Sequence, residues 1–133
     1  MAEIRLLTPT GHLGFTMLEP ESFRRGMAQR PDFVVADSGS SDIGPHPLGA
    51  DEQCSPVEWQ THDLETMLVA CRRQGVPMII GSAADTGTDR GVDRYVRIIR
   101  EAALRHGLPP FRLAYIYAEV SRDEIRRRLR AGV

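Results

Sequence analysis

The sequence predicts an α/β fold, a three-layer α/β/α sandwich around a mostly parallel four-stranded sheet of the Rossmann-like kind. First, short apolar runs rich in β-branched and aromatic residues alternate with stretches whose apolar residues recur at helical spacing. Second, two apolar runs lead into loops of Gly, Ser, Thr and Asp, as at the carboxyl edge of an open sheet. Because strands and helices alternate strictly, right-handed crossovers and parallel pairing are expected.

The first half of the chain contains two expected strands joined by one helix. Residues 4–8 are expected to form the first strand. Pro20 is well placed to begin a helix over residues 20–29, since the first helical residue needs no N–H group. The continuous apolar character of residues 33–36 suits a second strand that is covered on both faces.

Two capping boxes, at residues 55–58 and 121–124, each predict the start of a helix in the second half. The first of these helices is expected to end at Gly75. The other expected elements are strands over residues 76–81 and 111–119, a helix over residues 89–106 and a last helix from residue 121.

Composition limits the classes of function. A chain of 133 residues has the size of one ordinary domain, so residues 1–133 are expected to form a single α/β domain. A net charge of −1 argues against a nucleic-acid partner, and no apolar run is long enough for a membrane span. Cys54 and Cys71 do not suggest a disulfide framework, so a reduced cytoplasmic setting is expected.

The basic residues are also informative, because all 17 are arginine and the chain has no lysine. A P-loop requires a Gly-Lys-Ser/Thr sequence, and a Schiff-base enzyme requires a lysine amine. Both classes of site are therefore excluded.

The loop after the second expected strand is the strongest local signal for a site. Asp37 is the candidate catalytic residue, because a carboxylate at a strand end can hold a ligand hydroxyl, orient a base or bind a cation. The candidate ligand-binding residues beside it are Ser38, Gly39, Ser40 and Asp42. The alternative is that Asp37 and Ser38 only cap a turn through bonds to the backbone.

The loop after the third expected strand is a second candidate. Gly81, Ser82 and Ala83 would offer backbone N–H groups near a helix start, a natural place for a carboxylate or phosphate. The loop lacks the G-x-G-x-x-G spacing of a dinucleotide site, and Asp85 weakens a phosphate interpretation. The alternative is a plain turn followed by a Thr88 helix cap.

The first loop would face the same edge of the sheet. It contributes Thr10 as a candidate ligand-binding residue and His12 as the candidate acid–base catalyst, because histidine titrates close to physiological pH. A histidine in a loop can equally be a surface residue. A metal site could be assembled from His12, Asp37, Asp42 and His46, but no two of them have convincing ligand spacing, so no metal is assigned.

Three segments together resemble a known family. Residues 7–14, residues 36–45 with Leu48 and Gly49, and residues 79–83 are similar to the N-terminal part of the acyclic terpene utilisation AtuA-like proteins. The resemblance covers essentially the whole chain, and its middle segment is the most specific. It implies an α/β fold and a link to the catabolism of acyl or carboxylate metabolites.

The resemblance also has departures. Family members are usually much longer, which implies that this chain is a truncated product or one subunit of a split enzyme. Where the family has a glycine-rich third loop, this chain has Ala83, Ala84, Asp85 and Thr86.

The function expected from these observations is that of a small enzyme domain or subunit that binds a small polar or anionic metabolite, bearing a carboxylate or acyl group, at the carboxyl edge. The reaction type and the cofactor are not specified. A first alternative is a non-catalytic subunit that packs against a larger partner through an exposed sheet edge and the arginine-rich residues 126–130. A second is a nucleotide-binding module. A homo-oligomer or a separate larger subunit is expected in either main case.

Overall fold

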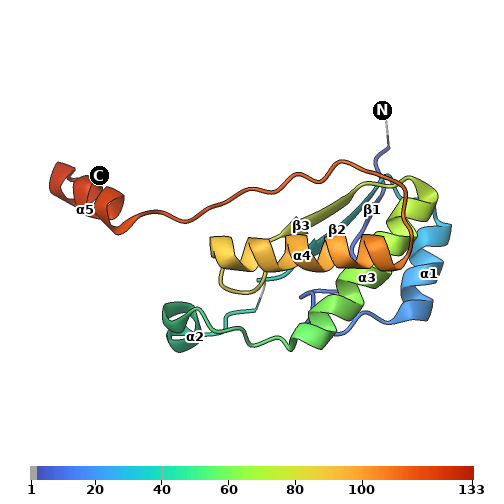
Figure 1. Ribbon diagram of the computed structural model, residues 1–133, viewed down its shortest axis with the longest axis horizontal. Helices are drawn as coiled ribbons and strands as arrows, with labels where there is room; N and C mark the ends of the chain where they lie inside the picture. Colours follow the sequence, from blue (N-terminus) through green and yellow to red (C-terminus); the bar gives the residue numbers. More distant parts are fainter. Residues whose placement is uncertain (1–2, 40) are drawn as a thin grey trace.

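The computed structural model describes residues 3–39 and 41–133 and has an α/β architecture around a parallel sheet (Figure 1). The strands are β1 (Leu6–Leu7), β2 (Phe33–Asp37) and β3 (Met78–Gly81), in the order β1-β2-β3. Both pairings are parallel. The parallel arrangement predicted for the first three strands is therefore confirmed.

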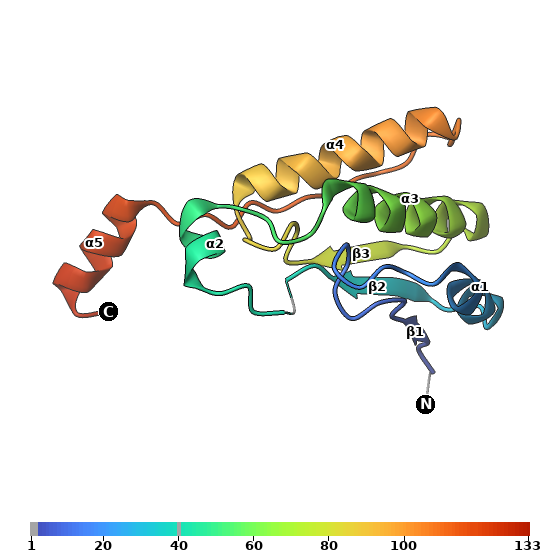
Figure 2. The same cartoon turned by 90° about the horizontal axis from the view of Figure 1, so that it is seen from below.

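The helices cover one face of the sheet. When sequential strands are added in one direction by right-handed crossovers, every crossover helix falls on the same side. Helix α1 (Pro20–Ala28) and helix α3 (Val57–Gln74) share one apolar core with β2. Figure 2 shows α3 and α4 (Asp89–Arg105) on the same side of the strands.

The alternation of burial along the strands follows from this arrangement. Val34 and Ala36 of β2 are buried beneath the helices, whereas Phe33 and Val35, which alternate with them along the strand, are only half-buried. Ile79 of β3, which pairs with Val35, is 49% exposed. The second face of the sheet thus carries apolar side chains and no helix among the described residues.

The start and stop signals of the helices have mixed outcomes. Pro20 begins α1, Gly75 ends α3 in the left-handed conformation, and Ser121 caps α5 (Arg122–Ala131), all as predicted. The prediction of a capping box at residues 55–58 is wrong. The N-cap of α3 is Pro56, and no side chain makes a capping hydrogen bond there. The hydroxyl of Ser55 donates instead to Asp85.

The long connection after β2 contains a helix that the sequence analysis did not predict. Helix α2 (Pro45–Ala50) begins at a proline and ends at Asp51, which adopts a left-handed φ of 52°. None of its residues is buried. Its ends are fixed by contacts of the flanking loop rather than by packing of the helix.

The predicted fourth strand is wrong. Residues 111–119 form an extended segment without strand pairing, so the sheet has three strands among the described residues. This segment leaves the end of α4, runs back along that helix and leads to α5, which stands apart from the rest of the chain (Figures 1 and 2). The three-layer sandwich is also not formed here, because one face of the sheet is uncovered.

None of the described helices combines the length and the apolar character that crossing a membrane requires.

Candidate site at the carboxyl edge

The loops after β2 and β3 meet at the carboxyl edge of the sheet. The N–H of Ser38 donates to the carbonyl of Gly81 at 3.0 Å. A Cβ atom added to Gly39 would lie 2.7 Å from the Cβ of Ser82, so only glycine allows this approach. The structure therefore brings four of the predicted site residues together: Asp37, Gly39, Gly81 and Ser82.

Asp37 is the accessible carboxylate of this group. It is half-buried at the end of β2, on the face of the sheet that the helices leave uncovered. One of its oxygens accepts the N–H of Gly39 at 3.1 Å, which is the turn-capping contact that the sequence analysis named as the alternative. A carboxylate can accept several hydrogen bonds, so this contact leaves it able to receive a ligand hydroxyl.

His12 is buried and holds two loops together. Its Nδ1 accepts the N–H of Ser41 at 3.2 Å, so the ring proton resides on Nε2, which lies 2.7 Å from Oδ1 of Asp85. The side chain is 2% exposed. Both nitrogens are thus occupied, and an acid–base role for His12 remains a prediction that requires the segment carrying Ser41 to move.

The carboxylate of Asp85 lies at the centre of this network. Besides His12, it accepts the backbone N–H groups of Cys54 and Ser55, each at 3.1 Å, and the Ser55 hydroxyl at 3.2 Å. A buried anion needs such partners, because its desolvation is otherwise costly. The N–H groups of Cys54 and Ser55 therefore bind the carboxylate of Asp85 from the third loop and are not free to bind an anionic ligand.

Ser38 and Thr10 have their hydroxyl groups turned into the protein. Ser38 is fully buried, and its hydroxyl is hydrogen-bonded to that of Tyr95 in α4. Burial is the main reason why the pKa of Tyr95 is raised. The Thr10 hydroxyl donates to the carbonyl of Thr16 at 2.6 Å. In this conformation both residues support the loops from behind the edge.

A second group of contacts fastens the long connection to the third loop. Asp51 accepts the hydroxyls of Thr86 and Thr88 at 2.7 and 2.9 Å and pairs with Arg90 at 2.5 Å. The Thr86 hydroxyl, and then Thr88 and Arg90, lower the pKa of Asp51. The amide of Gln53 also donates to the carbonyl of Ala84. These contacts fix the position of the loop that carries α2.

The third loop has an unusual backbone. Ser82, Ala84 and Asp85 are non-glycine residues with positive φ angles of 47°, 62° and 57°. Such angles cost roughly 1 kcal/mol or more each and persist only where surrounding contacts determine them. Here the N–H of Asp85 donates to the carbonyl of Ser38, and its side chain holds the network above. Strain of this kind is concentrated at functional sites in many proteins.

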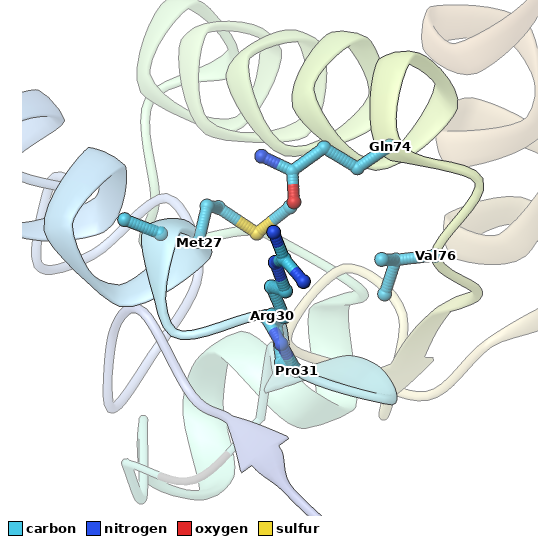
Figure 3. A pocket seen from close by; sticks show the side chains of 6 residues that line it. Met27, Arg30, Pro31, Gln74 and Val76 are labelled. Atoms are coloured by element: carbon cyan, nitrogen blue, oxygen red, sulfur yellow. The ribbon is translucent and has the colours of Figure 1, made fainter.

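A hollow of about 450 Å³ lies at the opposite, amino edge (Figure 3). Its lining includes Met27, Arg30, Gln74 and Val76. The carboxyl-terminal ends of α1 and α3 meet there, and the partial negative charge of helix ends favours an arginine side chain and opposes an anionic ligand. Among the described residues, the lining of the hollow contains no carboxylate, histidine or cysteine, and it lies at the edge opposite to the strand-end loops, so it is not part of the candidate site.

The structure does not bring every candidate to the site. Asp42 is exposed and accepts the N–H of the nearby Gly44, and His46 is exposed near Glu52. Ala83 is half-buried, whereas Ser40 lies outside the described residues.

Within residues 3–39 and 41–133, no three His, Cys, Asp or Glu side chains form a group suited to a metal ion. Burial raises the pKa of the Cys71 thiol to about 11, so this cysteine is not a nucleophile.

Several residues with important contacts were not proposed from the sequence. Asp63 in α3 is buried and accepts the N–H groups of Gly14 and Leu18 at 2.9 and 3.0 Å, which fixes the first loop. The sequence indicates Asp85 only as an obstacle to a phosphate ligand, not as the centre of a hydrogen-bond network. A polar residue at a position that faces the core is the one sequence signal that could have singled out Asp63.

Comparisons with protein-family models, with curated proteins and with solved structures found no match. The resemblance to the AtuA-like proteins consequently remains a prediction.

Proposed function

We propose that the chain binds a small metabolite bearing a carboxylate or acyl group at the carboxyl edge of its sheet, as an enzyme domain or subunit of a catabolic reaction. The observation that carries the proposal is the half-exposed carboxylate of Asp37 beside the meeting point of two strand-end loops. In open α/β sheets, ligands bind at this edge.

The chemistry of the edge favours one orientation of the ligand. A hydroxyl or other donor group would face Asp37, and a carbonyl oxygen would accept from the exposed Ser82 hydroxyl. A free carboxylate next to Asp37 would be repelled, so an ester, amide or thioester fits better than the corresponding acid. The buried pair of His12 and Asp85 would position the loops, and Asp37 would be the group that touches the ligand.

The test compares two aspartates that accept a backbone N–H. Asp37 lies at the carboxyl edge, whereas Asp32 accepts the N–H of Arg5 at the amino edge. Thermal denaturation of the wild-type chain, Asp37→Asn and Asp32→Asn is followed with panels of small hydroxyacyl esters, amides and acids. We expect ester-dependent stabilisation of the wild type and of Asp32→Asn, and its loss in Asp37→Asn. Equal stabilisation of all three chains would contradict the proposal.

A non-catalytic subunit is the second candidate, and the uncovered apolar face of the sheet favours it. Parallel sheets are normally covered on both faces, so this face fits contact with another chain. Absence of any ligand response, together with a stable assembly, would favour this function over the first.

A further inference from the structure

The sheet face without helices is a continuous apolar surface. Two pairs of strand neighbours lie on that face: Leu6 beside Phe33, and Val35 beside Ile79. The side chains of Leu6 and Ile79 are 65% and 49% exposed. We refer to these four residues as the bare face. A parallel sheet with such a face is half of a normal layered packing.

Helix α5 is a second unpartnered element of the same chain. Ile125 and Leu129 lie one turn apart, 47% and 72% exposed. Among the described residues, the side-chain hydrogen bonds of α5 lie within the helix or its caps, and both views show it away from the other elements (Figures 1 and 2). A helix of 10 residues is marginal in water by itself, so its stability depends on packing against a partner.

The chain cannot bring its own α5 to its own bare face while the arm is anchored. The hydroxyl of Tyr117 donates to Asp93 at 2.5 Å, and the N–H groups of Ala118 and Glu119 donate to Asp89. The N–H of Asp89 in turn donates to the Glu119 carboxylate at 3.0 Å. These anchors lie at the start of α4, on the helix-covered side of the sheet.

Only two residues separate Glu119, the last anchor, from the first residue of α5, so this piece of chain spans at most about 11 Å. Packed layers lie on the order of 10 Å apart, and α5 would have to cross two such spacings, about 20 Å, to pass from the layer of α4 to the far side of the sheet. The helix therefore has to find its partner surface on another molecule.

Charge favours the same pairing. Helix α5 has five arginines against two acidic residues, whereas the whole chain has a net charge of −1, so the remainder of the chain is acidic. A basic helix and an acidic body attract each other in the encounter between two chains.

We propose that two copies of this chain form a symmetric dimer in which α5 of each copy packs Ile125 and Leu129 on the bare face of the other. A twofold axis satisfies both unpartnered surfaces at once, as in exchanged-element dimers. The carboxylate of Asp37 is on the same face as Val35, so the partner's helix would lie next to the proposed ligand site. The dimer does not depend on the identity of the ligand.

The first experiment measures the mass of the full chain in solution by light scattering at tens of micromolar. We expect twice the chain mass of 14.8 kDa for the wild type. Leu129→Asp on α5 and Ile79→Asp on the bare face should each give a monomer with an unchanged circular dichroism spectrum. Leu104→Asp is the matched control, because Leu104 is 83% exposed on α4 outside both surfaces, and it should remain a dimer. A monomeric wild type, or monomers from all three variants, would overturn the proposal.

The second experiment identifies the contact directly and does not depend on the folding of a charged variant. Chains with Ile79→Cys are mixed with chains with Leu129→Cys, both also carrying Cys54→Ser because Cys54 is exposed. Oxidation should yield a disulfide between the two different chains. A Leu104→Cys chain is the control, and it should form no disulfide with either the Ile79→Cys chain or the Leu129→Cys chain. The absence of a disulfide between the Ile79→Cys chain and the Leu129→Cys chain would refute the exchange of α5.

Discussion

At the scale of single residues, the Asp85 carboxylate is a buried anion whose stability depends on the hydrogen bonds that it receives. It is buried and receives hydrogen bonds from His12, from two backbone N–H groups and from the Ser55 hydroxyl. The network joins three loops that are far apart in the sequence. Its integrity therefore determines whether the carboxyl edge has a defined shape.

The substitution Asp85→Asn tests this role. We expect it to lower the free energy of unfolding by about 3 kcal/mol, because an amide cannot accept all four bonds and brings two buried donors of its own. Urea denaturation measures the change. Asp42→Asn is the control, since Asp42 is exposed with one local contact, and its effect should stay within about 0.5 kcal/mol. Equal small effects would show that the network adds little stability.

Gly14 is a second residue whose identity is dictated by geometry. It has a φ of +81°, and a Cβ atom there would lie 2.5 Å from Cγ of Gln60. We expect Gly14→Ala to destabilise the fold by roughly 2 kcal/mol in thermal or urea denaturation. Gly49→Ala is the comparison, because nothing lies within 4 Å of a Cβ in α2 at that position, and it should be neutral or slightly stabilising.

At the scale of elements, the contact between Asp51 and the third loop should depend on pH. The pKa of Asp51 is lowered in the folded chain, chiefly by the Thr86 hydroxyl. A lowered pKa contributes stability above the pKa of the unfolded state, about 3.9, and this stability is lost as the pH falls through the folded-state pKa.

The expected difference between wild type and Asp51→Asn is less than about 1 kcal/mol near neutral pH, because the carboxylate is partly exposed. Urea denaturation should show this difference at about pH 6 and a smaller one at about pH 3. A difference that is constant over this range would mean that the charge of Asp51 does not stabilise the loop.

The elements also show which parts of the fold were predictable from the sequence. The first three strands and α1, α3 and α4 follow from local apolar patterns and from stop signals such as Gly75. The strand expected at residues 111–119 has a strand-like pattern, but its later part is held by side chains of α4 instead of the edge of β3. Pairing depends on such distant contacts, which a local pattern does not contain.

The candidate site was predictable to a similar extent. Asp37, Gly39, Gly81 and Ser82 were placed together correctly, because the ends of neighbouring parallel strands meet at one edge. The pairing of His12 with Asp85 spans 73 residues and could not be read from spacing. The inward orientation of Ser38 was also hidden, since it depends on Tyr95 in α4.

At the scale of the whole molecule, the carboxyl edge is held by many contacts, whereas two apolar surfaces remain exposed. The loops of the edge are fastened to each other by buried polar contacts, whereas the bare face and α5 have no partner among the described residues. The proposed dimer and the proposed ligand site meet at Asp37. The two proposals remain separable, because the mass of the chain and its response to a ligand are measured independently.

The most direct measurement for the central claim is a ¹H–¹⁵N NMR titration of the wild-type chain with the hydroxyacyl ester that stabilises it most. We predict that the largest shifts belong to the amide groups of Gly39, Ser41, Gly81 and Ser82 at the carboxyl edge. Arg30 and Gln74, which line the hollow at the amino edge, should be unaffected. Shifts concentrated at Arg30 and Gln74, or no saturable shifts at the carboxyl edge, would contradict the account.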